Sequence, residues 1–119
     1  MSAIRAKGHA FERELASHIN AATGLSATRT CLTQSQFNLS QGNCDLIGTP
    51  NLAIEAKRVE RLNFPEAFRQ AQTNAEPHEI PVVINRRSRQ ATGDSYCLLK
   101  LDDFLTLYKA YLKQESLCP

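Results

Sequence analysis

The run LAIEAKRV at residues 52–59 is the feature that most constrains how this chain can fold. Its residues alternate, and a β-strand places successive side chains on opposite faces. One face would carry the apolar side chains of Leu52, Ile54 and Ala56 into a core. The other face would carry Ala53, Glu55 and Lys57. The pattern therefore predicts a strand with a carboxylate and an ammonium group side by side on one face.

A second acidic residue, Asp45, precedes this strand. Residues 44–48 (CDLIG) predict a short strand, and residues 49–51 (TPN) predict a tight turn between the two. In such a hairpin Asp45 would approach Glu55, although neighbouring carboxylates repel and a part-buried Lys57 is costly to desolvate. A Mg²⁺ ion between the carboxylates would offset this, because it prefers hard oxygen ligands and retains waters that can act as nucleophiles. The alternative is a turn aspartate beside a solvated strand face.

The spacing of these residues resembles the D-x(n)-(D/E)-x-K signature of the PD-(D/E)XK nucleases. Asp45 is followed by nine residues and then by Glu55, Ala56 and Lys57, whereas Cys44 replaces the proline that gives the family its name. The resemblance implies that Asp45, Glu55 and the backbone carbonyl of Ala56 bind Mg²⁺, for which Mn²⁺ can substitute. It also implies that Lys57 orients or activates the attacking water and stabilises charge on the scissile phosphate.

The beginning of the chain predicts an amphipathic helix over residues 6–22, which Gly24 is placed to end. Its apolar side chains recur at helical spacing, at Phe11, Leu15, Ile19 and Ala22. Glu12 and Glu14 flank this stripe on opposite sides. Periodicity puts both near the edge of the buried face and does not choose between them.

A second resemblance distinguishes the two glutamates. Residues 7–15 (KGHAFEREL) resemble the K-G-x-x-x-E-R-E-L opening of the archaeal-type Holliday junction resolvases, a branch of the same nuclease superfamily. In that family the first glutamate of E-R-E contributes to the metal site, directly or through water, and it maps to Glu12. The alternative is a helix-surface glutamate paired with Arg5 or another nearby base.

Residues 25–31 (LSATRTC) predict a strand that carries Arg29 where the family has an arginine. Its guanidinium could hold a phosphate or a carboxylate of the site, or it could simply lie on a strand face. The polar segment 32–43 predicts a loop, in which Ser35 or Ser40 could match a functional serine of the family.

Four more elements follow the central strand. They are a helix at 64–75, strands at 80–85 and 96–100, and a helix at 104–113. Either Gln70 or Gln72 corresponds to the glutamine that related nucleases carry after E-x-K. The order αβββαββα predicts a single α/β domain over residues 1–119. The resemblance implies a restriction-endonuclease-like PD-(D/E)XK core, with a central mixed β-sheet flanked by helices.

Composition limits the class of protein further. A chain of 119 residues can bury a modest core, and no apolar run approaches the roughly 18 residues of a membrane span. No signal peptide is recognisable, so a cytoplasmic location without membrane partners is expected. The four cysteines, Cys31, Cys44, Cys97 and Cys118, form no C-x-x-C pair, which argues against zinc and for reduced thiols.

The net charge is only +2, but the basic residues are grouped locally, which suits a phosphate backbone as well as an ordinary solvated surface. The residues expected to contact DNA are Lys7, Arg13, Arg29, Ser35, Ser40, Arg58, Arg61 and Gln72.

The motifs together predict a metal-dependent, structure-specific DNA endonuclease, a Holliday junction resolvase whose hydrolysis leaves a 5′-phosphate. The alternatives are another PD-(D/E)XK nuclease that cuts flaps, ends or duplex, and a non-catalytic DNA-binding protein on this fold. A four-way junction must be cut on two strands, which predicts a homodimer. Its surface could include Leu98, Leu101, Leu105 and Tyr108, for which core packing is the alternative.

Overall fold

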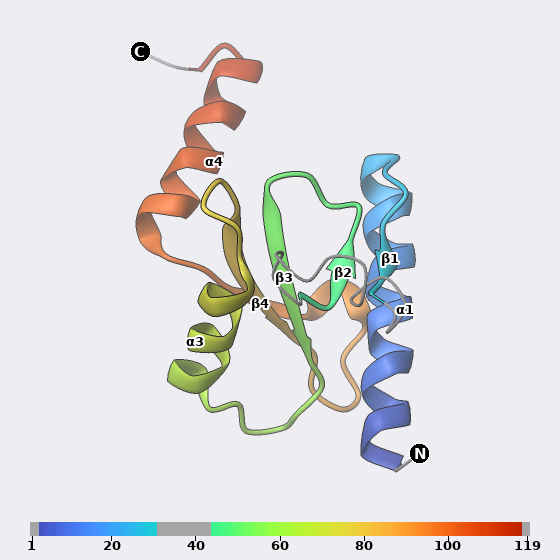
Figure 1. Cartoon of the computed structure of the whole chain (residues 1–119). Coiled ribbons are helices and arrows are strands. Elements are labelled where there is room, and N and C mark those ends of the chain that lie inside the picture. Colours follow the sequence, from blue (N-terminus) through green and yellow to red (C-terminus); the bar gives the residue numbers. More distant parts are fainter. Residues whose placement is uncertain (1–2, 31–43, 118–119) are drawn as a thin grey trace.

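A computed structural model describes residues 3–30 and 44–117 (Figure 1). Its helices are α1 (Ala3–Thr23), α3 (Phe64–Asn74) and α4 (Leu101–Gln114), with a short 3₁₀ helix η1 (Thr92–Asp94). Its strands are β1 (Thr28–Arg29), β2 (Leu46–Ile47), β3 (Leu52–Lys57), β4 (Ile80–Asn85) and β5 (Tyr96–Leu98). This order confirms the predicted α/β succession. The predicted loop 32–43, with Ser35 and Ser40, lies outside the described residues.

The strands form a mixed sheet, as predicted, but the sheet is divided. β3 and β4 are parallel and β4 and β5 are antiparallel, in the order β3-β4-β5. β1 and β2 form a separate antiparallel pair, in which Thr28 lies opposite Ile47. The predicted β2–β3 hairpin is therefore only partly correct. The turn is present, and in it the N–H of Leu52 donates to the carbonyl of Thr49 at 3.1 Å. However, among the described residues β2 pairs with β1 rather than with β3.

Gly48 shows why β2 turns towards β1. Its φ is +84°, and a Cβ at this position would lie 2.8 Å from the backbone oxygen of Ser26. Only glycine allows the backbone to approach this closely in that conformation. The end of β2 therefore packs closely against the chain that leads into β1.

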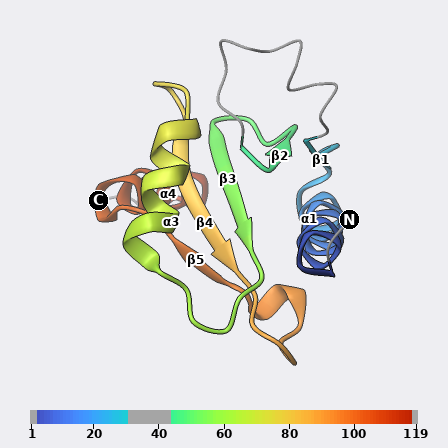
Figure 2. The same ribbon diagram turned by 60° about the horizontal axis from the view of Figure 1, so that its bottom comes forward.

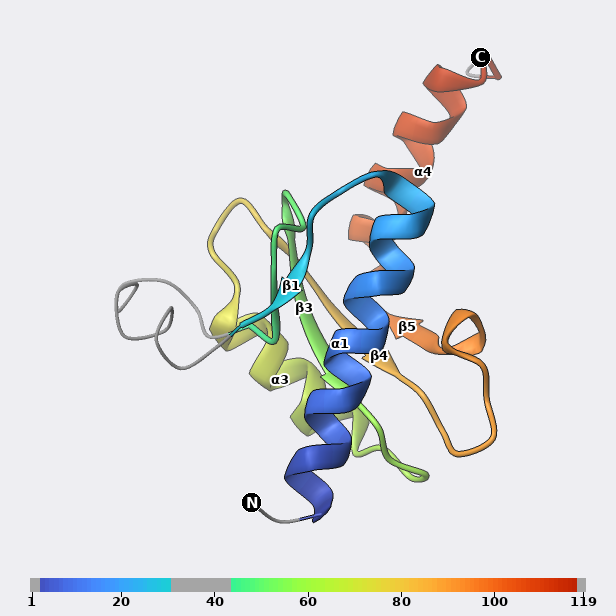
Figure 3. The same ribbon diagram turned by 90° about the vertical axis from the view of Figure 1, so that its right-hand side faces the viewer.

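Helices α1 and α3 cover opposite faces of the three-stranded sheet (Figures 2 and 3). On the α1 side, Phe11 and Leu15 pack with Ile54. On the α3 side, a smaller cluster contains Ala67, Ala71 and Val83. Parallel strands joined by a crossover helix are typically buried on both faces. The face of β3 that carries Glu55 and Lys57 therefore lies under α3, and the solvated-face alternative is wrong for Glu55.

The C-terminus of α1 and the N-terminus of α3 follow local sequence signals. Gly24, at φ +78°, donates its N–H to the carbonyl of Asn20 and ends α1 where the sequence predicts. Asn63 caps α3 by accepting from the N–H of Glu66 at 3.2 Å, and Pro65 lies in the first turn. Among the described helices, none is long and apolar enough to cross a membrane.

Helix α4 extends away from the rest of the molecule (Figures 1 and 3). None of its residues, all of which are described, is buried. Leu101 is 68% exposed and Tyr108 is 47% exposed. The core-packing alternative for Leu101, Leu105 and Tyr108 is therefore wrong, because no other described element lies over them.

Candidate active site

Asp45 directly precedes β2 in the sequence. It lies at the free edge of β3, that is, the edge that does not pair with β4. Its N–H donates to the carbonyl of Ile54 at 3.0 Å, and its own carbonyl accepts from the N–H of Thr30 at 2.8 Å. Its side-chain Oδ2 accepts from the N–H of Ala56 at 2.8 Å. β4 occupies the other edge of β3, so Asp45 satisfies a backbone donor that would otherwise lack a strand partner. Two backbone–backbone hydrogen bonds thus fix the backbone of Asp45, and one bond from a backbone N–H fixes its carboxyl group.

Glu55 lies beside Asp45, as the sequence predicts. Burial is the main cause that raises the pKa of Asp45, to about 7, and the charge of Glu55 and its hydrogen bond to Asp45 raise this pKa further. The N–H of Ala56 and the charge of Lys57 lower it. Glu55 is 5% exposed, and its Oε1 accepts from Nδ2 of Asn74 at 2.8 Å. The site therefore contains two carboxyl groups in contact, away from bulk water.

Lys57 points to the same side of β3 as Glu55. Its Nζ donates to Oε1 of Gln70 at 2.9 Å. Of the two candidate glutamines, Gln70 is therefore the one at Lys57, whereas Gln72 is exposed. Gln70 and Asn74 are four residues apart, so they lie on one face of α3 and orient the two charged groups of β3. Asn74 was not among the predicted site residues, although its spacing of four residues from Gln70 could have indicated it.

The structure places the two glutamates of α1 on different sides. The side chain of Glu12 is 13% exposed, and its Oε1 accepts from Nε of Arg29 at 3.1 Å. Burial raises the pKa of Glu12, the charge of Asp45 raises it further, and Arg29 lowers it. The side chain of Glu14 is 50% exposed and lies 3.5 Å from Arg86. Glu12 thus lies near enough to Asp45 for their charges to interact, and Arg29 binds the Glu12 carboxylate.

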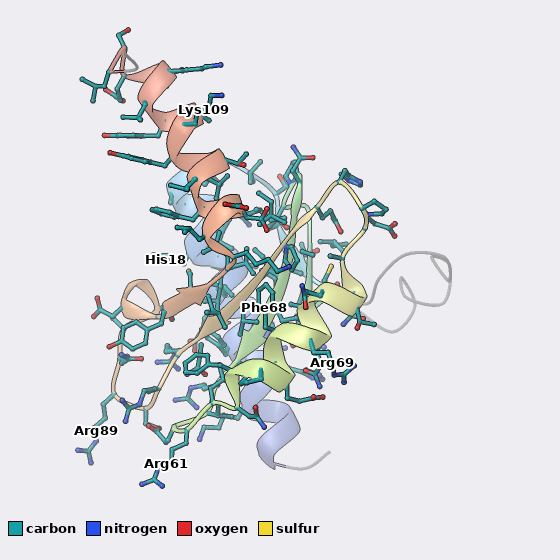
Figure 4. All side chains as sticks on the ribbon, turned by 90° about the vertical axis from the view of Figure 1, so that its left-hand side faces the viewer. His18, Arg61, Phe68, Arg69, Arg89 and Lys109 are labelled. Atoms are coloured by element: carbon teal, nitrogen blue, oxygen red, sulfur yellow. The ribbon has the colours of Figure 1, made fainter. Side chains whose placement is uncertain are left out.

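The remaining basic residues predicted to contact DNA are spread over the surface. Lys7, Arg13 and Arg61 are exposed, and Arg58 is partly buried. Arg13 lines a shallow depression of about 620 Å³ together with Glu14 and His18, on the flank of α1 away from Glu12. Arg61 and Arg89 extend into solvent at one end of the molecule (Figure 4). None of these contacts the acids of the site within the described residues, so their role in DNA binding stays a prediction.

The chemistry of the donors bears on the predicted metal. Within residues 3–30 and 44–117, no group of three or more His, Cys, Asp and Glu is arranged to hold a metal ion. Glu12 is turned to Arg29, which leaves Asp45 and Glu55 in contact. The N–H of Ala56 points to the edge that Asp45 occupies, and in a strand the carbonyl of the same residue points to the same edge. Two carboxyl groups and one carbonyl are hard oxygen donors, which fit Mg²⁺ or Mn²⁺ rather than zinc.

The sequence matches no family model, no curated protein and no solved structure.

Proposed function

We propose that this chain is a metal-dependent DNA endonuclease of the PD-(D/E)XK type, with a restriction-endonuclease-like fold, and that it resolves four-way DNA junctions. The observation that carries this proposal is the convergence of Asp45, Glu55, Lys57 and Glu12. These residues come from α1, from the segment before β2 and from β3. Asp45 and Glu55 are in contact. The charge of Asp45 also interacts with the charges of Glu12 and Lys57.

The roles of the residues follow from their positions. Asp45, Glu55 and the carbonyl of Ala56 would hold Mg²⁺, for which Mn²⁺ can substitute, and Glu12 would join them directly or through water. When bound, the cation supplies a Lewis acid and lowers the pKa of a bound water. It would also return the pKa of Asp45 towards its ordinary value, because an adjacent positive charge favours the carboxylate.

Lys57 would act on the phosphate and on the attacking water. Its Nζ is held by a neutral acceptor, Gln70, rather than by an acid. The ammonium charge therefore remains available to stabilise the negative charge that develops on a phosphate placed between Lys57 and the acids. The same group would orient the water for in-line attack, which leaves a 5′-phosphate.

The junction as substrate comes from the resemblance of residues 7–15 to the resolvases. Glu12 supports that alignment, because it is the glutamate of the motif that faces Asp45. A junction is cut on two strands, so we expect two copies of the chain to act together.

A cleavage assay tests the proposal. A four-way junction and a linear duplex of matched sequence are incubated with the chain in Mg²⁺, in Mn²⁺ and in a chelator. We expect Mg²⁺- and Mn²⁺-dependent cuts with 5′-phosphate ends, more rapid on the junction. Glu14→Gln is the matched control for Glu55→Gln, since Glu14 lies outside the site. Equal cleavage of junction and duplex would show a general nuclease rather than a junction resolvase. The absence of cleavage of any DNA would contradict the whole proposal.

A further inference from the structure

Helix α4 lacks the contacts that normally stabilise a helix of its length. It has 14 residues and no buried residue. Isolated helices shorter than about 12–15 residues are marginal in water, and most helical stability in proteins comes from packing an apolar face. The rest of the described chain does not provide that packing, as the projection of α4 in Figure 4 also shows.

The apolar face of α4 is nevertheless well defined. Its exposed apolar side chains are Leu101, Phe104, Leu105, Leu107, Tyr108 and Tyr111. The rings of Phe104 and Tyr108 stack at 6.1 Å between centroids, and those of Tyr108 and Tyr111 at 6.3 Å. Asp102, Lys109 and Lys113 follow one another at spacings of seven and four residues, which puts them along one flank of this face. The helix is therefore amphipathic with its apolar side in solvent.

An apolar groove lies where the chain leaves β5 for α4. It has a volume of about 320 Å³ and is lined by Phe64, Pro65, Phe68, Leu98, Leu99 and Lys100. Phe68 and α4 lie on the same side of the molecule in Figure 4. Lys100, which lines the groove, is also the residue that precedes the first turn of α4, so the groove adjoins the start of the helix. We take the groove and the apolar face of α4 together as the candidate surface, because exposed apolar surfaces mark sites of association.

We propose that a second copy of this chain covers this surface, with the two α4 helices packed antiparallel about a twofold axis. The charges of α4 select this partner. Asp102 and Asp103 lie in the first turn, and Lys113 lies in the last. An axis at the middle of the helix places Asp102 opposite the partner's Lys113, and the same contact is repeated at the other end. A parallel pair would instead place like charges together.

The available area suits a stable pair. Phe64, Phe104, Tyr108 and Tyr111 are each about half exposed. Since a fully buried aromatic side chain covers roughly 150–250 Å², these four leave on the order of 400 Å² available. The leucines of α4 and of the groove add to this. A standard interface buries about 800 Å² on each partner, so the four rings alone supply about half of the area that a stable pair needs.

This inference does not rest on the proposed nuclease function, and its test needs no activity. The original full chain and its variants Tyr108→Asp and Ala110→Asp are each examined by sedimentation velocity over a range of concentrations. Both substitutions place an acid on α4, but Ala110 lies on the polar side of the helix. We expect a dimer that Tyr108→Asp weakens at least about 100-fold and that Ala110→Asp changes little, because only the first acid would be buried without a partner.

A charge exchange tests the antiparallel arrangement. Asp102→Lys alone and Lys113→Asp alone each place like charges at both ends of a pair, whereas a mixture of the two variants restores opposite charges at both ends. We expect each variant to associate about tenfold more weakly than the original chain, and the mixed pair to recover this loss. A chain that is monomeric at every concentration, a dimer insensitive to Tyr108→Asp, or a mixture no tighter than its components would overturn the proposal.

Discussion

The free edge of β3 and the apolar face of α4 depart from the usual distribution of side chains in opposite directions. At the edge of β3, the half-buried Asp45 lies against Glu55, which is almost inaccessible to solvent. On α4, rings and leucines are exposed and no residue is buried. Buried acids and exposed apolar faces are the two informative exceptions to burial rules. Each costs free energy in the isolated chain, and the two groups that we propose, a cation and a second chain, would each offset one of these costs.

The proposed group differs between the two regions because their chemistry differs. Two carboxyl groups in contact need positive charge, and the raised pKa of Asp45 reports that a proton partly supplies it. An apolar helix face needs another apolar surface. We therefore expect changes at the edge of β3 to affect cleavage and metal binding without affecting association, and changes on α4 to do the reverse.

The largest effect is expected from the acids. Asp45→Asn and Glu55→Gln should each abolish cleavage, because either change removes a metal ligand, while DNA binding stays intact or becomes tighter as repulsion of phosphate falls. Cleavage rates and DNA affinities measured side by side test this. Both variants should sediment as the unchanged chain does. Cleavage by either variant at near the original rate would show that the acids do not form the site.

A smaller but still large effect is expected from Lys57. Lys57→Ala should fold, bind Mg²⁺ and lose about 10²-fold or more in cleavage rate, as on removal of a charge stabiliser or general acid–base group. Arg69→Ala is the control, because Arg69 is a basic residue of the neighbouring helix whose guanidinium is held by Glu66. Single-turnover rates with saturating chain separate the effect on the chemical step from binding. An unchanged cleavage rate would show that Lys57 is a surface charge with no role in catalysis.

The two glutamates of α1 provide a matched pair. Glu12→Gln should slow cleavage about tenfold or more, since Glu12 faces Asp45, whereas Glu14→Gln should be mild. Rates on the same junction at one Mg²⁺ concentration make the comparison. The reverse pattern would show that Glu14, beside Arg86, is the glutamate that matters.

The smallest expected effect is on stability and its dependence on pH. The pKa of Asp45 is about 7 in the folded chain and about 4 when unfolded. The folded state therefore binds more protons between these values, so this group's contribution to stability is complete below about pH 4 and is lost as pH rises through 7. Without metal, Asp45→Asn should melt about 5 °C or more above the original chain at pH 8, and the difference should shrink at pH 5.

Adding Mg²⁺ at pH 8 sharpens this measurement. It should raise the melting temperature of the original chain, because a cation that binds only the folded state stabilises it, and should raise that of Asp45→Asn much less. Tyr108→Asp should respond to Mg²⁺ as the original chain does. An original chain that melts at the same temperature at pH 5 and pH 8, with and without Mg²⁺, would contradict the description of the acid pair.

Local sequence patterns by themselves determined the order of the elements and several of their ends. Gly24 ends α1 because it accepts a positive φ, and Pro65 fits the first turn of α3 because its nitrogen needs no hydrogen bond there. The alternation of residues 52–59 placed Glu55 and Lys57 on one face. It did not indicate that this face is buried, since burial depends on the later crossover helix α3.

Only the tertiary structure decided which residues meet. Periodicity treats Glu12 and Glu14 alike, and the packing of α1 on β1 and the sheet turns Glu12 to Arg29 and Asp45. The packing of α3 on β3 distinguishes Gln70 from Gln72 in the same way. For α4, a helix that covers its own core and one that covers a partner have the same amphipathic period. Sequence pattern reports which side of an element is apolar, whereas the surface that covers it is set by contacts between distant parts of the chain or between chains.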